Sequence, residues 1–357
     1  MLNISRCNQC VLPSTYPGIV FDSKGTCSYC SSYISSPPPL GEDQLIKIIS
    51  KEDKIPYNCI VPLSGGKDST FVVYYAKRVL NLRPIAVNYD SGFQSSLAKG
   101  NIQRTCEILG VPLVIFKADF KYRLAHAKEV LRISKLVGVP FGVCGNCETY
   151  IRASLTFVAR KYNISIVLYG DSQYEKTKHG SFYGIHGLLN KVQLKKLHNL
   201  LISLARYVSI EAFERSKLRL PFHQVINIFK PIPFPIKNLK IVHFFDFVAW
   251  NTINKEKLLA EAVDWRHPEG SIDRFDCLLH PLDNFKWLKE TGITKDGFIY
   301  ANMVRENIFS RDDAINKEDK MQNNIVDDCY EFIHRFGFDK IGFDWLYKPE
   351  TCVKMRR

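Results

Sequence analysis

The chain has 357 residues, of which 46% are hydrophobic, and its formal net charge is +13 at pH 7. This composition excludes a disordered chain, and the length suffices for two domains or for one large domain with appendages. The longest apolar run, 241–250, is too short to span a membrane, and cysteines stand where a signal peptide needs an apolar core, so we expect a cytoplasmic protein.

Two C-x-x-C pairs lie in the first 36 residues: Cys7 with Cys10, and Cys27 with Cys30. Pairs at this spacing are typical of a zinc site with four thiolate ligands. The segment is too short to fold around its own apolar core, so a bound metal would stabilise it. We therefore predict a structural Zn²⁺ site here, because four sulfur ligands leave no open coordination position for catalysis.

Strand and helix patterns alternate after the prolines at 37–39 and a short predicted helix at 44–49. Apolar runs rich in Val and Ile alternate with helical periodicity, which predicts a doubly wound parallel α/β sheet. The predicted strands are 60–63, 84–89, 111–116 and 164–169. The predicted helices are 69–80, 97–109, 123–136 and 149–162.

The loop after the first predicted strand carries the most specific motif of the chain. It reads Ser64-Gly65-Gly66-Lys67-Asp68-Ser69-Thr70. Glycines let the backbone approach a ligand closely, and a helix N-terminus attracts anions such as phosphate. The Walker loop needs Gly-Lys-Ser/Thr, which is absent here, and so is the dinucleotide G-x-G-x-x-G pattern.

The order Ser-Gly-Gly-x-Asp-Ser after a strand resembles the PP-loop of ATP pyrophosphatases, which cleave ATP between the α- and β-phosphates. The resemblance implies that residues 64–70 bind ATP, that Lys67 contacts phosphate and that Asp68 organises the loop. It also implies that the backbone near Asn88 and Asp90, where the second strand ends, holds the adenosine. Gly170 and Asp171 end the later strand, and an acidic residue beside phosphates is a candidate Mg²⁺ ligand.

A third C-x-x-C pair, Cys144 and Cys147, precedes the predicted helix at 149–162. One interpretation is a second site, in which Cys277 joins the pair to bind an iron–sulfur cluster. The other is that the two cysteines are structural or line the substrate pocket. The sequence alone leaves both interpretations open.

The alternation of strands and helices stops after residue 187, and the remainder is predicted to be mainly helical. We therefore predict three parts: a zinc-ribbon-like segment at 1–40, a PP-loop ATP-binding domain at 41–187 and a helical region at 188–357.

A wider resemblance covers most of the chain and is most specific at its start. The opening motif is Cys7-x-x-Cys10-Val11-Leu12-Pro13-Ser14-Thr15-x-Pro17-Gly18-Ile19-x-Phe21-Asp22. It resembles the N-acetyl sugar amidotransferases, PP-loop enzymes of surface-polysaccharide and nonulosonic-acid pathways such as LPS O-antigen biosynthesis. Residues 268–275 depart from the family, because its His-Tyr-Glu stretch is missing while Arg274 and Phe275 remain.

The family resemblance implies conversion of an acetamido group on a nucleotide- or lipid-linked N-acetyl sugar to an acetamidino group. Adenylation would activate the amide oxygen, and ammonia would then replace AMP, with Lys67, Asp68 and Asp171 as catalytic residues. The implied cofactors are ATP, Mg²⁺ and Zn²⁺. Ammonia would come from a separate HisH-like glutaminase subunit, with a cyclase-like channel subunit as a second candidate partner.

Two other classes of function stay open from the sequence. A tRNA-thiolating sulfur transferase uses the same adenylation, and it would explain the basic charge and an Fe–S cluster on Cys144 and Cys147. A non-enzymatic zinc-ribbon module with a degenerate nucleotide fold is the third class, and the intact loop from Ser64 to Ser69 argues against it.

Overall fold

A computed structural model describes residues 5–50, 56–137, 145–172, 174, 194–216, 239–250, 254–268 and 274–337. Its strands are β1 Cys59–Pro62, β2 Pro84–Asp90, β3 Leu113–Lys117, β4 Ile166–Tyr169 and β5 Lys240–His243. Its α-helices are α1 Ser28–Ser31, α2 Glu42–Ser50, α3 Lys67–Tyr74, α4 Ser96–Leu109, α5 Phe120–Val137, α6 Gly145–Tyr162, α8 Leu194–Ser216, α10 Lys255–Val263, α11 His280–Thr291, α12 Lys295–Arg305 and α13 Arg311–Arg335.

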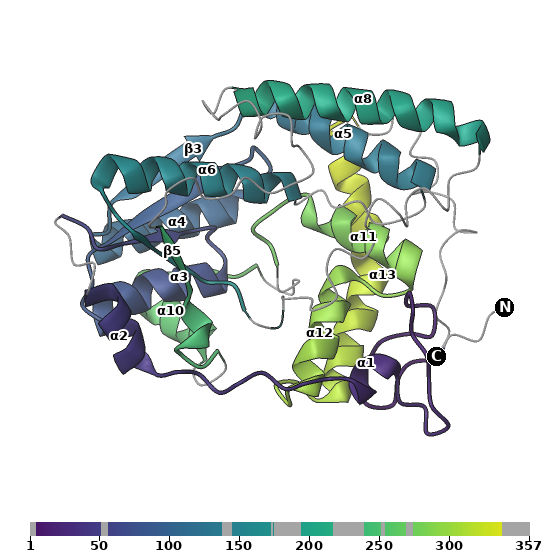
Figure 1. Ribbon diagram of the computed structural model, residues 1–357, viewed down its shortest axis with the longest axis horizontal. Helices are drawn as coiled ribbons and strands as arrows, with labels where there is room; N and C mark the ends of the chain where they lie inside the picture. The colour runs from purple at the N-terminus through teal and green to yellow at the C-terminus, as the bar shows by residue number, and fades with distance from the viewer. Residues whose placement is uncertain are drawn as a thin grey trace.

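The five strands form one parallel sheet in the order β3-β2-β1-β4-β5 (Figure 1). Helices α3, α4 and α10 share an apolar core with one face of the sheet, and α6 covers the other face. The predicted doubly wound α/β class is therefore confirmed. Strand order reverses between β1 and β4, and ligands of such sheets bind at the carboxyl ends of the strands beside that point.

Strand β5 was not predicted, because the sequence pattern from residue 241 onwards indicates a helical region. Strand β5 pairs with β4 from Ile166↔Lys240 to Tyr169↔His243, and a short 3₁₀ helix follows at Phe244–Asp246. The predicted helix at 69–80 begins earlier, at Lys67, and continues as a π-helix over Tyr75–Val79. The predicted limits of the three parts of the chain stay a prediction.

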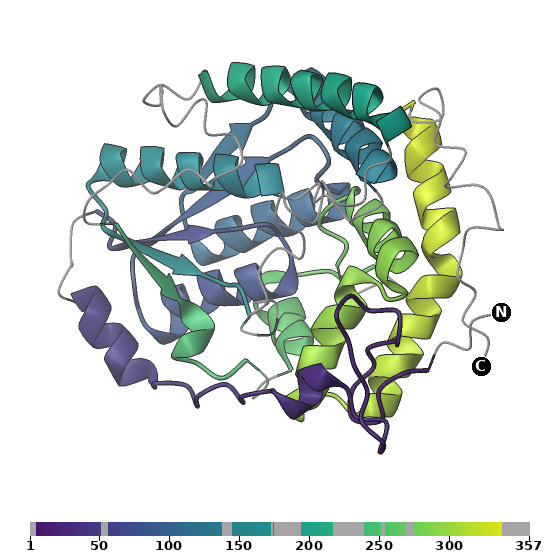
Figure 2. The same ribbon diagram turned by 45° about the vertical axis from the view of Figure 1, so that its right-hand side comes forward.

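The described part of the chain after β4 is mainly helical, as predicted. Helices α11 and α13 pack together with α5 and α8, and α12 lies against α13. The N-terminal cysteine segment lies on α12 and α13, and residues 32–41 run from it to α2 beside the sheet (Figure 2). None of the helices in the described part of the chain has the length and hydropathy that a membrane span requires.

A buried ion pair on α11 gives this helical half a predictable response to acid. Asp283 is 1% exposed, and its carboxylate lies 2.8 Å from Lys295 Nζ and 3.9 Å from Lys286 Nζ. Burial alone would raise the pKa of Asp283, but the two ammonium groups outweigh it and lower the pKa to about 2. Its ordinary value in an unfolded chain is about 3.9.

We expect the stabilisation from Asp283 to be complete above about pH 4 and to be lost as the pH falls towards 2, because only the folded state resists protonation there. The loss amounts to about 2 kcal/mol. Urea unfolding between pH 7 and pH 2 measures it. An Asp283→Asn variant should be less stable at pH 7 and should lose part of this pH dependence, whereas Asp312→Asn, at an exposed position of α13, should match the wild type.

Candidate functional site

The loop between β1 and α3 is closed by its own side chains. The Ser64 N–H donates to Ser69 Oγ at 3.2 Å, the Gly66 N–H donates to Ser64 Oγ at 3.3 Å, and Ser69 Oγ donates to the Gly66 carbonyl at 3.2 Å. Gly65 has φ +84°, and a Cβ there would lie 2.3 Å from the Ala98 carbonyl oxygen. Only glycine fits that position, because any side chain would be strained and would clash with backbone.

Side chains from other elements bind the carbonyl oxygens of this loop. The Ser64 carbonyl accepts from Gln94 Nε2 at 2.9 Å. The Gly65 carbonyl accepts from Trp265 Nε1 at 3.0 Å and from Asn101 Nδ2 at 3.2 Å. The first-turn N–H groups of α3 have no intrahelical acceptor, so the loop and the helix start offer donors to an anion.

Two crossed ion pairs join the start of α3 to the start of α10. Asp68 Oδ1 lies 2.9 Å from Lys255 Nζ, and Lys67 Nζ lies 3.6 Å from Glu256 Oε1. The Lys255 side chain is only 4% exposed, and its Nζ lies 4.0 Å from the centroid of the Trp250 ring. Burial lowers the pKa of Lys255 to about 8, and the Asp68 carboxylate partly offsets this effect.

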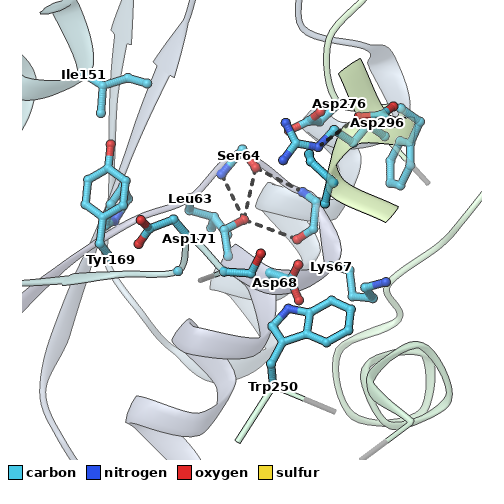
Figure 3. Close-up of a pocket in the computed structure, with 18 of the residues that line it drawn as sticks. Leu63, Ser64, Lys67, Asp68, Ile151, Tyr169, Asp171, Trp250, Asp276 and Asp296 are labelled. Carbon is cyan, nitrogen blue, oxygen red and sulfur yellow. Dashed lines mark hydrogen bonds and ion pairs between the residues drawn. The ribbon is translucent and has the colours of Figure 1, made fainter. Parts of the chain in front are cut away.

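A cavity of about 580 Å³ opens at the carboxyl ends of β1, β2 and β4, above the loop (Figure 3). Ser64, Gly66, Lys67, Asp68 and Ser69 line it. This is the location that the sequence predicted for a ligand, and the structure brings the three strand ends together there. Gly65 and Thr70 are not among the residues that line the cavity, and Thr70 is fully buried in α3.

The two predicted strand-end sites differ in their surroundings. Asn88 lines the cavity and its Nδ2 donates to the Leu63 carbonyl at 2.8 Å, whereas Asp90 pairs with Lys99 at 2.8 Å. Gly170 and Asp171 line the cavity, and Asp171 Oδ1 lies 2.6 Å from His243 Nδ1 of β5. A Cβ at Gly170 would lie 3.1 Å from Val72, so glycine lets β4 approach α3 closely.

The C-terminal half supplies a wall of the cavity that the sequence analysis did not predict. Asp276 and Asp296 lie across the loop from Tyr169 and Asp171 (Figure 3). Asp296 is 3% exposed, and its Oδ2 lies 2.6 Å from His280 Nε2 and accepts from Asn284 Nδ2 at 2.9 Å. Burial alone would raise the pKa of Asp296, but His280 and Arg274 outweigh it and hold that pKa well below the ordinary carboxyl range.

The four N-terminal cysteines form a compact metal-ligand set. The sulfur atoms of Cys7, Cys10, Cys27 and Cys30 all lie within 4.8 Å of one another, and three of the residues are buried. Backbone N–H groups of Gln9, Leu12 and Cys27 donate to sulfur at 3.2–3.5 Å. This set fits a metal with four thiolate ligands, and both zinc and an iron–sulfur cluster take such ligands.

Cations of α12 and α13 bind the cysteine segment from outside. The Arg305 guanidinium lies 3.3 Å from both Cys10 Sγ and Cys30 Sγ, and Arg311 Nε donates to the carbonyls of Cys7 and Cys10 at 3.0 Å. A divalent ion with four thiolates carries two net negative charges, and Arg305 would offset part of them.

The predicted second cysteine site stays a prediction. Cys144 lies outside the described residues. Arg123 Nη2 donates to Cys147 Sγ at 2.9 Å, and Cys277 forms a β-bridge with Gln94 next to Asp276. Within the described ranges, the N-terminal four are the cysteines that gather as a set of three or more metal ligands.

No protein-family profile matches the chain. An uncharacterized protein of Methanocaldococcus jannaschii is 24% identical over 163 residues, which cover 40% of this chain and 58% of that protein. The match therefore spans less than two thirds of that relative.

Two solved structures are similar to parts of this chain. The U34-tRNA thiolase NcsA of Methanococcus maripaludis, determined with its [4Fe-4S] cluster, is 16% identical with a TM-score of 0.32, over 84% of this chain and 88% of that one. NMN synthetase of Francisella tularensis is 17% identical with a TM-score of 0.27, over 52% and 83%.

Proposed function

We propose that the chain binds ATP at the loop after β1 and transfers AMP to the amide oxygen of an N-acetyl sugar. The observation that supports this most is the loop itself, which is closed by Ser64 and Ser69 and requires glycine at Gly65. The loop lines a cavity beside the point where the strand order of the parallel sheet reverses, between β1 and β4. Backbone donors at a helix N-terminus suit the triphosphate of a nucleotide.

The shape of the cavity suggests how ATP lies in it. On the side of α6 the lining includes Val87, Tyr89, Ile151 and Ser154. An apolar wall with a few polar groups suits adenosine. The phosphates would then lie over the loop, where Lys67 adds a positive charge, and Asp171 is the candidate ligand for Mg²⁺.

The proposed reaction has two steps. The amide oxygen attacks the α-phosphorus, pyrophosphate leaves, and an O-adenylylated imidate forms. Ammonia then adds to the imidate carbon, the C–O bond breaks and AMP leaves, which yields the acetamidino group. Donors at the loop would stabilise the charge on departing pyrophosphate. The ammonia source and the channel partner, a glutaminase and a cyclase-like subunit, belong to the proposal.

The test is AMP formation from ATP, Mg²⁺ and ammonium in the presence of free and nucleotide-linked N-acetyl sugars. We expect AMP and pyrophosphate in equal amounts, and isotopically labelled nitrogen from ammonium in the sugar product. ATP binding without AMP formation from any acetamido sugar would contradict the amidotransferase. Thiolated tRNA from the same protein would support the alternative, and failure to bind ATP would leave only a non-catalytic module.

A further inference from the structure

We infer that Asp296 and Arg274 form the acceptor subsite of this cavity and that they bind hydroxyl groups of the sugar ring. This inference rests on the proposed function and adds to it the residues that select the acceptor. Asp296 lies across the loop from Tyr169 and Asp171 (Figure 3), and Arg274, whose Nε is 4.0 Å from Asp296 Oδ1, lines the same cavity. With adenosine beside α6 and the phosphates over the loop, the end of the cavity beside Asp296 is left for the second substrate.

Asp296 has the features of a carboxylate held in place for a ligand. It lies in the first turn of α12, where its N–H donates to Asn284 Oδ1 at 3.3 Å. His280 and Asn284, which fix its Oδ2, are 4% and 1% exposed. Burying a charge is costly unless it is hydrogen-bonded, so a buried carboxylate with fixed orientation on a cavity wall indicates a binding role.

Within the described residues, the other oxygen of Asp296, Oδ1, takes part in no hydrogen bond. Asp296 Oδ1 lies 4.0 Å from Arg274 Nε, which is beyond hydrogen-bond distance. A carboxylate only accepts hydrogen bonds and a guanidinium only donates them. Adjacent hydroxyl groups of a sugar can bind to both side chains, because one hydroxyl donates to Asp296 while its neighbour accepts from Arg274.

The charges at this end favour a sugar ring over a phosphate group. The charged side chains that line the cavity from residues 274–317 are two cations and two carboxylates, namely Arg274, Lys317, Asp276 and Asp296, so this wall has no net positive charge. A phosphate placed here would meet both carboxylates. Apolar side chains complete the wall, namely Ile299 and Met303 of α12. We therefore place the sugar ring at this end of the cavity. The phosphate groups of its nucleotide or lipid carrier would lie outside this end.

Two variants test the assignment in the AMP-forming assay. Asp296→Asn and Arg274→Gln should each raise the KM for an accepted N-acetyl sugar by about 10-fold or more, because each removes a charge-assisted hydrogen bond. Calorimetry should show a Kd for ATP within about twofold of the wild type for both. Asp312→Asn on α13 is the matched control and should change neither constant. The Arg274 side chain is 36% exposed, so its variant should fold even if Asp296→Asn does not.

A deoxy analogue of the sugar identifies the contact itself. Removal of the hydroxyl that binds Asp296 should weaken binding to the wild type but not weaken it further in Asp296→Asn. Unchanged KM values in folded Arg274→Gln and Asp296→Asn would overturn the inference while the proposed function stands. Wild-type protein that binds ATP and forms no AMP with any acetamido sugar would overturn the proposed function, and the acceptor subsite with it.

Discussion

Replacement of Lys255 by Met is expected to weaken ATP binding by about 30-fold or more, or about 2 kcal/mol. Lys255 Nζ is the cation that holds the loop carboxylate of Asp68, at 2.9 Å, and it is enclosed by the rings of Trp250 and Phe245. Methionine would fill the same space without the charge. Asp68 would then lie unpaired beside the phosphates and would repel them.

Calorimetric titration with ATP and Mg²⁺ measures the effect. Lys255→Arg keeps the charge and should retain part of the affinity. Lys257→Met removes an exposed cation from the same turn of α10, and it should bind ATP as the wild type does. A folded Lys255→Met protein with wild-type affinity would show that the pair with Asp68 has no part in nucleotide binding.

The pH dependence of the wild type provides an independent measurement of the same ion pair. Because the pKa of Lys255 is lowered to about 8, its ammonium is lost as the pH rises through that value, and ATP affinity should fall there. The free energy of unfolding should instead rise with pH over the same range. Burial of the charged amine costs up to about 3 kcal/mol below pH 8, and this cost disappears as the pH rises towards the unfolded pKa near 10.4. Both effects should be absent in Lys255→Met.

The loop was predictable because its residues are contiguous and their order is specific. The strand ends were predictable for a similar reason, since Asn88 and Gly170 directly follow apolar runs and parallel strands bring their carboxyl ends to one edge. Local pattern and one topological rule therefore sufficed to place the centre of the cavity.

The partners of these residues could not be predicted, because the fold brings them together from distant parts of the chain. Lys255 stands in a Lys-Glu-Lys run that is typical of an exposed helix surface, yet it is buried against α3. His243 meets Asp171 only because β5 adds to the sheet beside β4. Asp296 and His280 become a pair only when α11 and α12 pack together.

Loss of the metal at the four N-terminal cysteines is expected to disturb the C-terminal helices as well as the N-terminal segment. The cysteine segment has a small apolar core shared with α12 and α13, in which the Tyr16 ring stacks on Phe298 at 5.6 Å. Thr15 Oγ1 donates to the Thr291 carbonyl, and Tyr33 OH donates to Glu306. These contacts depend on the fold of the cysteine segment. A structural zinc ion would stabilise that fold by about 10 kcal/mol or more.

We therefore expect one zinc ion per chain, and we expect Cys27→Ser or a strong chelator to lower the Tm by on the order of 10 °C. Helix α12 carries both Phe298, which contacts the cysteine segment, and Asp296 of the proposed acceptor subsite. Partial metal loss should thus raise the KM for the acceptor before it changes ATP affinity, because the loop after β1 is held by α4 and α10 instead.

This order is tested on one set of samples. The measurements are the metal content, the Tm, the KM for the acceptor and the Kd for ATP. Cys106→Ser, which changes a buried thiol of α4 away from the segment, should retain one zinc ion per chain. Iron with visible absorbance in the anaerobically purified protein, lost in Cys27→Ser, would instead identify a cluster at this site. Unaltered acceptor binding after complete metal removal would show that α12 holds its position without the cysteine segment, so that the site and the metal are structurally independent.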